Sequence, residues 1–353
     1  MKNSQYYTKD LSFVIIGKNA EWSIARLLDS ILAHMPRQVT SEIIYVDSAS
    51  IDRTIKVVSR YPVKIVQLSA NQPLCASAGR FIGSQHASGK YIAFIDSDME
   101  LLDGWSERAL KALDGHPEIA VVSGIQANGN PAARPEEHEM IDYPPYQQDK
   151  FTEIKFAGSA AIFRHKVLDI VGTWNPYIIS DEEPELCLRI RHAGYRIVEL
   201  SCPSVRHFGY ALPTISALLL RRKRRLFLGP GQAIRYHLHA GLILPYLRER
   251  GYMISPALAV LLAIGSIFLS CVDRTVFWFL GFLSIASFMF IIDAIRSRSV
   301  YRAAFHVLHR ALILEGTLKG LFINPLPCDK YPCEVQLLDP YPDVAAEIKT
   351  GAS

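Results

Sequence analysis

The sequence lacks three features that would place it in other classes of protein. Met1 to Asp10 has no apolar core, so we find no secretory signal peptide and expect the first part of the chain to stay in the cytoplasm. The six cysteines fit no common zinc spacing, even the closest two, Cys328 and Cys333, and scattered cysteines suit a reducing compartment. The formal net charge of +4 is small, so no nucleic-acid partner is expected.

Long apolar runs are present, but they occur only after residue 250. Residues 253–272 and 275–292 are separated by Asp273-Arg274, and each is long enough to cross a hydrocarbon core of ~30 Å as a helix. Basic residues flank both runs, which predicts that both flanks are cytoplasmic. The alternative is a buried helical hairpin in a soluble domain. Residues 303–323 are amphipathic and are expected at the membrane interface or as a re-entrant segment.

The first 100 residues alternate short apolar strands with amphipathic helices, which predicts βαβ units and a mostly parallel sheet. The predicted strands are 11–16, 42–46, 63–67 and 91–95, and the predicted helices are 22–34, a helix from Asp52, and 74–87. Ligands in such sheets bind beyond the carboxyl ends of the strands. Asp47 and Asp96 both follow strands, so one crevice is expected to use both.

Residues 120–210 have a less regular pattern. We predict a strand over 154–163, followed by a helical stretch, then a helix from Asp181 to Ala193 and a strand over 195–200. The segment from Asn130 to Asp149 is rich in Pro, Glu and Tyr, which is typical of a mobile loop.

Acidic residues and one histidine are the candidates for catalysis and for metal or nucleotide binding. Asp96 and Asp98 follow an apolar strand, and two carboxylates at this spacing can share a divalent cation that also holds a diphosphate. An acid pair in a surface turn is the other interpretation. Asp47 is either a turn former or an acceptor for a nucleoside. The acidic residues 181–185 either complement a helix N-terminus or supply a general base. His207 is either structural or a further metal ligand.

The order of these segments resembles the family-2 glycosyltransferases, which are inverting enzymes with the GT-A fold. The resemblance covers about residues 10–210. It rests on the first strand with Asn19, on 42–54, on Gly79-Arg80 through Asp96-Ser97-Asp98, on Gly158 through Gly172, and on Glu182 through Tyr195.

The resemblance implies a role for each matching residue. It places Asn19, Asp47, Arg80 and Asp96 at the nucleotide-sugar donor; Asp96, Asp98 and His207 at Mg²⁺ or Mn²⁺; and Gly158, Glu185 and Arg189 at the acceptor. Glu183 takes the position of the base, with Glu182 as a close competitor, because the family usually has Asp there. Phe81 stands where the family often has Asn. A UDP-sugar is the default donor.

Gln232-Ala-Ile-Arg235-Tyr236 is similar to the Gln-x-x-Arg-Trp motif of membrane-embedded polysaccharide synthases. This similarity implies that Gln232 and Arg235 lie beside the acceptor. Tyr236 replaces the Trp, and two predicted spans are few for a polymer channel. We therefore expect single sugar addition rather than processive synthesis.

The sequence thus predicts an α/β GT-A catalytic domain over 1–212, basic interfacial helices over 213–250, two transmembrane helices over 251–295, and an amphipathic segment with a tail over 296–353. The expected protein is a bacterial inner-membrane glycosyltransferase with a cytoplasmic catalytic domain. Its expected acceptor is a lipid-linked or membrane-bound saccharide in cell-envelope or exopolysaccharide synthesis. The alternatives are a polyprenyl-phosphate sugar transferase and a catalytically silent nucleotide-sugar-binding scaffold.

Overall fold

The computed structural model describes residues 7–129, 150–158, 160–209 and 213–338. These residues form two compact units. The first unit comprises 7–178, 182–209 and 326–338, and the second comprises 179–181 and 213–325. The predicted loop from Asn130 to Asp149 lies outside the described residues.

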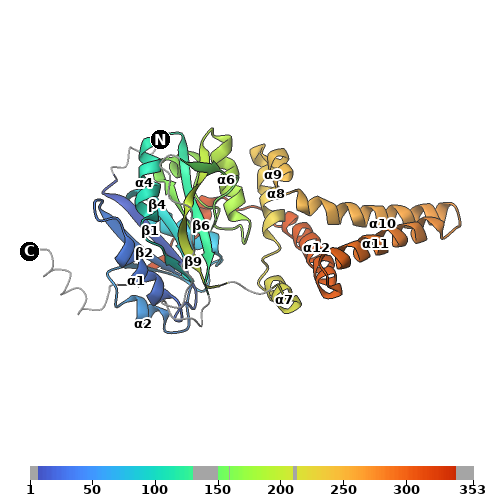
Figure 1. Ribbon diagram of the computed structural model, residues 1–353, viewed down its shortest axis with the longest axis horizontal. Helices are drawn as coiled ribbons and strands as arrows, with labels where there is room; N and C mark the ends of the chain where they lie inside the picture. Colours follow the sequence, from blue (N-terminus) through green and yellow to red (C-terminus); the bar gives the residue numbers. More distant parts are fainter. Residues whose placement is uncertain (1–6, 130–149, 159, 210–212, 339–353) are drawn as a thin grey trace, which may run out of the picture. The chain divides into compact units, whose positions relative to one another are not determined.

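The first unit is a sheet with helices on both faces (Figure 1). Its strands are β1 (Lys9–Gly17), β2 (Ser41–Asp47), β3 (Lys64–Leu68), β4 (Gly89–Asp96), β5 (Met99–Leu101), β6 (Ile119–Asn128), β7 (Phe151–Glu153), β8 (Ala161–Arg164), β9 (Arg196–His207) and β10 (Val335–Leu338). Its helices are α1 (Ile24–His34), α2 (Thr54–Val58), α3 (Ala76–His86), α4 (Trp105–Gly115), α5 (His165–Val171), α6 (Glu182–His192) and the 3-10 helix η3 (Cys328–Lys330).

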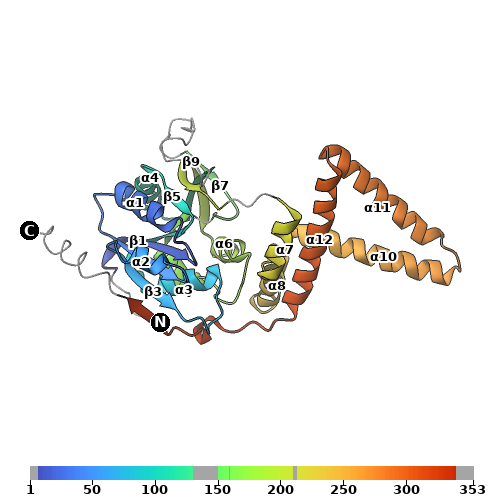
Figure 2. The ribbon, with the colours of Figure 1, turned by 90° about the horizontal axis from the view of Figure 1, so that it is seen from below.

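Strands β3, β2, β1 and β4 pair in parallel, as the alternation of strands and helices predicted. Side chains of β1 alternate between the two faces. Phe13 and Ile15 join a core with Leu27 of α1, whereas Val14 packs in a second core with Phe81 of α3. Figure 2 shows α1 and α3 on opposite sides of these strands. Both faces are covered, which explains why the strand is a nearly continuous apolar run.

The other half of the sheet is mixed, so the prediction of a mostly parallel sheet holds only for the first half. Within the described residues the strand order is β10-β3-β2-β1-β4-β8-β6-β9-β5, with β7 paired to β9. Pairing is parallel between β6 and β9 and antiparallel at β5, β7, β8 and β10.

The predicted strand over 154–163 is wrong for most of its length. Pairing is confined to β7 before it and to β8 at its end. Phe156 is exposed, whereas Ala161 and Ile162 are buried between β4 and β6. Ala157 and Ala160 are buried without belonging to a strand, so the apolar residues here reflect core packing rather than sheet pairing.

The end of the described chain returns to the first unit. Strand β10 pairs antiparallel with the edge strand β3 (Figure 2). Just before it, Tyr331 is buried, stacks edge-on against Phe81 and donates a hydrogen bond to the carbonyl of Pro73 at 2.6 Å. The predicted segment 296–353 is therefore not one piece, because residues from Leu326 onward complete the sheet.

The second unit is helical. It contains α7 (Ile215–Lys223), α8 (Gly229–Ala240), α9 (Ile243–Glu249), the 3-10 helix η2 (Gly251–Met253), α10 (Ile254–Val272), α11 (Phe277–Arg296) and α12 (Val300–Leu321). Helices α8 and α12 approach closely at glycines: a Cβ on Gly320 would lie 2.2 Å from the carbonyl oxygen of Leu228. A side chain at Gly320 would therefore force the two helices apart.

Helices α10 and α11 pack side by side as a hairpin (Figure 1). They match the two predicted apolar runs, and Gly251–Val272 and Phe277–Arg296 are long and apolar enough to cross a membrane. Within these stretches 11% and 0% of the most apolar window is buried inside the chain. The hairpin is therefore not the buried core of a soluble helical domain.

Candidate active site

The carboxyl ends of β1, β2 and β4 meet at one edge of the sheet. The amide of Ser48, just after β2, donates to the carbonyl of Gly17 at 2.9 Å, and the amide of Ser97, just after β4, donates to the carbonyl of Ile16 at 3.0 Å. A Cβ on Gly17 would lie 2.5 Å from the hydroxyl of Tyr45, so this approach requires glycine. The end of β1 thus draws the turns after β2 and β4 together.

Asp47 is buried at the end of β2 and keeps one carboxylate oxygen without a partner. Its Oδ2 accepts from the amide of Ser50 at 2.9 Å and from Nε2 of Gln67 at 3.0 Å. Its Oδ1 is buried and has no hydrogen-bond partner among the residues that the structure describes. Leaving a buried acceptor unpaired costs about 1–3 kcal/mol. A ligand that donates a hydrogen bond to this oxygen would remove that cost.

Asn19 organises the loop beside Asp47. Its backbone is in the left-handed region (φ +53°), its amide donates to Oγ of Ser50 at 2.8 Å, and its side-chain oxygen accepts from the amide of Ile51 at 2.9 Å. The predicted donor residue Asn19 therefore holds the loop that carries Ser50, one of the partners of Asp47.

Arg80 lies at the centre of a buried acidic cluster. Its Nη2 is 2.9 Å from Oδ1 of Asp96, and its Nη1 is 2.9 Å from Oε1 of Glu182 and 3.1 Å from Oε1 of Glu183. The guanidinium also lies 4.9 Å from the ring centre of Trp174. Because guanidinium presents several donors in a rigid fork, one arginine can hold acids from separate segments.

This cluster contains more acid than base. One guanidinium faces three carboxyl groups that lie within 3.1 Å of it. Burial, and then the charge of Glu183, raise the pKa of Glu182 to about 8. Burial also raises the pKa of Asp96, against the opposing effect of Arg80. Burial and the charge of Glu183 thus disfavour a negative charge on Glu182, which reduces the excess negative charge.

The structure distinguishes the two neighbouring glutamates that the sequence left as competitors. Both lie in the first turn of α6, where the helix dipole favours acidic residues. The side chain of Glu182 is 8% exposed and that of Glu183 is 23% exposed. Of these two glutamates, Glu183 combines contact with Arg80 and the greater access from solvent.

Asp98 forms a separate pair with His207. Oδ2 of Asp98 is 3.1 Å from Nε2 of His207, and this hydrogen bond raises the pKa of the imidazole. The pairing of β5 with β9 sets the contact, and the amide of Phe208 donates to the carbonyl of Asp98 at 2.9 Å. A Cβ on Gly209 would lie 1.9 Å from Oδ2 of Asp98. Glycine therefore leaves room beside the carboxylate.

The predicted metal set of Asp96, Asp98 and His207 is not assembled in the structure. Among the described residues, no three His, Cys, Asp or Glu side chains converge on one metal position. Asp96 is instead bonded to Arg80. Asp98 and His207 together offer one oxygen and one nitrogen donor. Mg²⁺ is often held by one or two protein carboxylates together with phosphate oxygens, so the pair fits a cation shared with a ligand.

The predicted acceptor residues lie in several places. Glu185 is buried and forms an ion pair with Arg189 at 2.7 Å, and Arg189 also donates to the carbonyls of Val171 and Thr173. We therefore reassign this pair from acceptor contact to holding the segment before Trp174. Gly158 is exposed.

Gln232 and Arg235 lie on α8 in the second unit, where the amide of Ile179 donates to Oε1 of Gln232 at 3.1 Å. Sequence reasoning missed Trp174 and Gln67, because no local pattern connects them to the site.

Parallel strands β3-β2-β1-β4, an acidic carboxyl edge and a helix that begins with acidic residues are the features expected of the GT-A fold. Residues 12–172, which are less than half of the chain, match the family model described as Glycosyl transferase family 2. This match indicates a glycosyltransferase domain within the first unit.

Similar proteins include transferases of one sugar type. Polypeptide N-acetylgalactosaminyltransferase 3 of Taeniopygia guttata is 31% identical over 119 residues, which are 32% of this chain and 19% of that protein. Polypeptide N-acetylgalactosaminyltransferase 6 of Homo sapiens is 23% identical over 254 residues, which are 61% of this chain and 40% of that protein. The chain thus spans less than half the length of these curated relatives.

A similar solved structure is that of S. aureus TarS 1-349 in complex with UDP-GlcNAc. It has 17% sequence identity and a TM-score of 0.48, and the match covers 88% of this chain and 90% of that chain.

Proposed function

We propose that this protein is an inverting, metal-dependent glycosyltransferase that moves a sugar from a nucleotide-diphosphate sugar to a membrane-associated saccharide acceptor. The observation that carries this proposal is the cluster in which Arg80 joins Asp96 at the end of β4 to Glu182 and Glu183 at the start of α6. It places an accessible carboxylate at the carboxyl edge of a family 2 domain, the edge where α/β sheets bind ligands.

The donor would be bound by residues at the ends of β2 and β4. The unpaired Oδ1 of Asp47 would accept a hydrogen bond from the nucleoside. Asp98 and His207 would hold Mg²⁺ or Mn²⁺, which when bound neutralises charge on the departing diphosphate. The names of the curated relatives make UDP-N-acetylgalactosamine the first donor to test.

Glu183 would remove the proton from the acceptor hydroxyl. Its carboxylate reaches solvent, whereas Glu182 is more deeply buried and holds a proton because burial raises its pKa to about 8. Glu182 and Arg80 would act as positioning residues that fix the orientation of Glu183. A general base typically contributes a factor of about 10²–10⁴ to the rate.

The acceptor would be membrane-bound, such as a lipid-linked saccharide in cell-envelope or exopolysaccharide synthesis. The two exposed apolar helices support this location. Basic residues flank both spans, which favours an inner-membrane protein with its catalytic domain in the cytoplasm.

The decisive experiment is donor hydrolysis and transfer by the full chain in neutral detergent. UDP-, GDP- and dTDP-sugars would be compared with Mn²⁺, Mg²⁺ and EDTA. We expect release from one donor, lost with EDTA and reduced about 10²–10³-fold in Asp98→Asn. Asp103→Asn, which removes a charge from an exposed aspartate nearby, is the matched control and should change little. An Asp98→Asn protein with full activity would contradict the metal assignment.

A second pair of variants tests the base. Glu183→Gln should retain donor binding by calorimetry and lose transfer about 10²-fold or more. Glu182→Gln should lose less, because the wild-type group is already protonated at neutral pH. The reverse order would move the base to Glu182. Absence of donor binding in the wild type would favour the silent scaffold, and transfer onto a lipid phosphate alone would favour the polyprenyl-phosphate reaction.

A further inference from the structure

A polar cavity of about 700 Å³ lies at the base of the α10–α11 hairpin, within the second unit. Ser255, in the first turn of α10, and Asp293, in the last turn of α11, both line it. The turn that joins the two helices, 273–276, is at the opposite end of the hairpin. If the hairpin crosses a membrane, the cavity therefore opens at the level where lipid headgroups lie.

Two charged groups in the cavity are already paired. Nδ1 of His306 is 3.0 Å from Oδ2 of Asp293, which ties α12 to the end of α11. Nε of Arg250 donates to Oδ2 of Asp181 at 2.9 Å. These pairs account for both aspartates in the cavity wall.

Three cationic or basic side chains in the wall have no carboxylate partner among the residues that the structure describes: Arg221, His309 and Arg310. The rings of Phe227 and His309 lie 5.9 Å apart, and the guanidinium of Arg221 lies 5.9 Å from the ring of Phe227. The pKa of His309 is lowered by burial first and then by Arg221, His306 and Arg310, which shows that their positive charges act at one place.

The wall also has an apolar side, formed by Leu226, Phe227, Pro230 and Ile313. A ligand for this cavity would therefore carry a compact anion and an attached apolar part. Arginine is the side chain best suited to phosphate, because its donors match pairs of phosphate oxygens.

We propose that this cavity binds the phosphate group of a membrane lipid, with Arg221 and Arg310 as its charge partners. The proposal rests on the membrane location given under the proposed function, and it does not depend on sugar transfer. A lipid phosphate held here would sit at the end of the same hairpin that anchors the chain.

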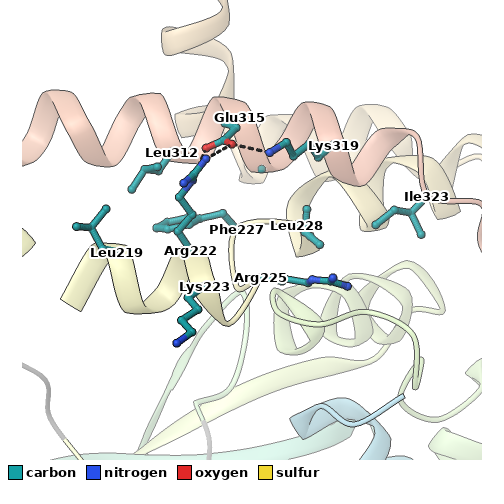
Figure 3. A pocket seen from close by; sticks show the side chains of 11 residues that line it. Leu219, Arg222, Lys223, Arg225, Phe227, Leu228, Leu312, Glu315, Lys319 and Ile323 are labelled. Carbon is teal, nitrogen blue, oxygen red and sulfur yellow. Dashed lines mark hydrogen bonds and ion pairs between the residues drawn. The ribbon is translucent and has the colours of Figure 1, made fainter. Parts of the chain in front are cut away.

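A second cavity of about 690 Å³, which is also lined by Phe227, gives an internal comparison (Figure 3). There Arg222 and Lys319 converge on Glu315 at 2.7 and 2.6 Å, and these hydrogen bonds lower the pKa of Glu315 to about 2. Arg225 also lines this second cavity, but in the described part of the chain no residue of α10 or α11 does. The second cavity therefore does not lie at the base of the hairpin, and its position does not favour a lipid ligand.

The test is ligand binding to the full chain in neutral detergent, measured by thermophoresis. Dioctanoyl phosphatidic acid, dioctanoyl phosphatidylcholine and inorganic phosphate are the three probes. Arg310→Gln has a matched control in Arg302→Gln, an exposed arginine of the same helix outside the cavity. Arg221→Gln is matched by Arg224→Gln, which lines neither cavity, and Arg225→Gln reports on the second cavity.

We expect phosphatidic acid to bind about tenfold more tightly than phosphatidylcholine, and inorganic phosphate to bind weakly. Arg310→Gln and Arg221→Gln should each weaken phosphatidic acid binding about fivefold, with less than about twofold change in Arg302→Gln and Arg224→Gln. Arg310→Lys should restore most of the affinity, which separates loss of charge from misfolding.

Three results would overturn the proposal. Equal losses in Arg302→Gln and Arg310→Gln would show a diffuse surface effect. A loss confined to Arg225→Gln would place the lipid in the second cavity. Equal affinity for inorganic phosphate and phosphatidic acid would show a site for free phosphate. Because sugar transfer is not measured, these results leave the proposed catalytic activity to its own test.

Discussion

The two units place the same apolar residue types in opposite environments. In the first unit many large apolar side chains, Trp105 and Trp174 among them, are fully buried. In the second unit α11 is made largely of Phe, Leu and Ile, yet none of its residues is buried within the chain. The first unit buries its large apolar side chains within itself. The hairpin leaves a large apolar surface exposed, which is typical of a surface that a membrane or a partner covers.

Charged groups show the reverse arrangement. The first unit buries Arg80 with three acids, an arrangement that is tolerated only when each charge is paired or protonated. Among its described residues the second unit has one largely buried ion pair, between Asp181 and Arg250, and the hairpin carries charge only near its boundaries. Four substitutions test this difference between the two units.

Arg80→Met should give the largest change. It leaves buried carboxyl groups without their cation and should lower the free energy of unfolding by about 3–5 kcal/mol, measured by denaturant titration with tryptophan fluorescence. The control is Arg53→Met, which removes an exposed ion pair to Glu21 and should cost at most about 1 kcal/mol. Equal effects would show that the buried cluster does not stabilise the first unit.

Ile285→Arg tests whether α11 faces lipid. Ile285 is 65% exposed on α11, and a charge near the middle of a membrane helix costs about 2.5–3.5 kcal/mol. We expect less of the variant to stay in the membrane pellet after alkaline carbonate extraction. Ile51→Arg is the matched control, because Ile51 is 91% exposed in a loop of the first unit. If both variants stay in the pellet equally, α11 does not span the membrane.

Gly320→Val tests the helix packing inside the second unit. A side chain there would meet the backbone of Leu228, and overpacking of this kind costs about 1–3 kcal/mol. The thermal midpoint of the detergent-solubilised protein should fall. Gly265→Val on α10 meets nothing within 4 Å and should leave the midpoint almost unchanged. A harmless Gly320→Val would show that α8 and α12 do not need their close contact.

A pH slope in the first unit tests the raised pKa of Glu182. The pKa of Glu182 is raised from 4.5 to about 8, so the folded chain binds a proton that the unfolded chain has released between these values. Stability should therefore fall as pH rises from about 4.5 to about 8. Unfolding midpoints at pH 5, 6.5 and 8 should show a shallower fall in Glu182→Gln. If the fall in the unfolding midpoint with pH were the same in Glu182→Gln as in the wild type, other titratable groups would be its cause.

Local sequence patterns were sufficient for much of the fold. The apolar runs that became β1 to β4, and the helical periodicity of α1 and α3, were predicted at nearly their observed positions. The prediction that Asp47 and Asp96 lie at one edge of the sheet followed from the parallel pairing of the strands, because the carboxyl ends of parallel strands meet at the same edge. The two apolar helices were also predicted, since length and hydropathy depend only on the residues themselves.

Other features depended on contacts between distant segments. Arg80 and Glu182 are 102 positions apart, and Tyr331 reaches Pro73 across 258 positions. No local pattern indicates that Arg80 contacts Asp96 and Glu182, or that a strand after Leu326 completes the sheet.

The types of element, the family match over residues 12–172 and the acids available for chemistry follow from the amino-acid sequence, because periodicity and motif order are local properties. Only the packed structure separates the buried acids from the accessible ones. Burial raises the pKa of Glu182 and leaves Glu183 accessible, although the two are identical neighbours in the chain. The desolvation that separates them comes from packing around α6, which depends on residues far away in the sequence.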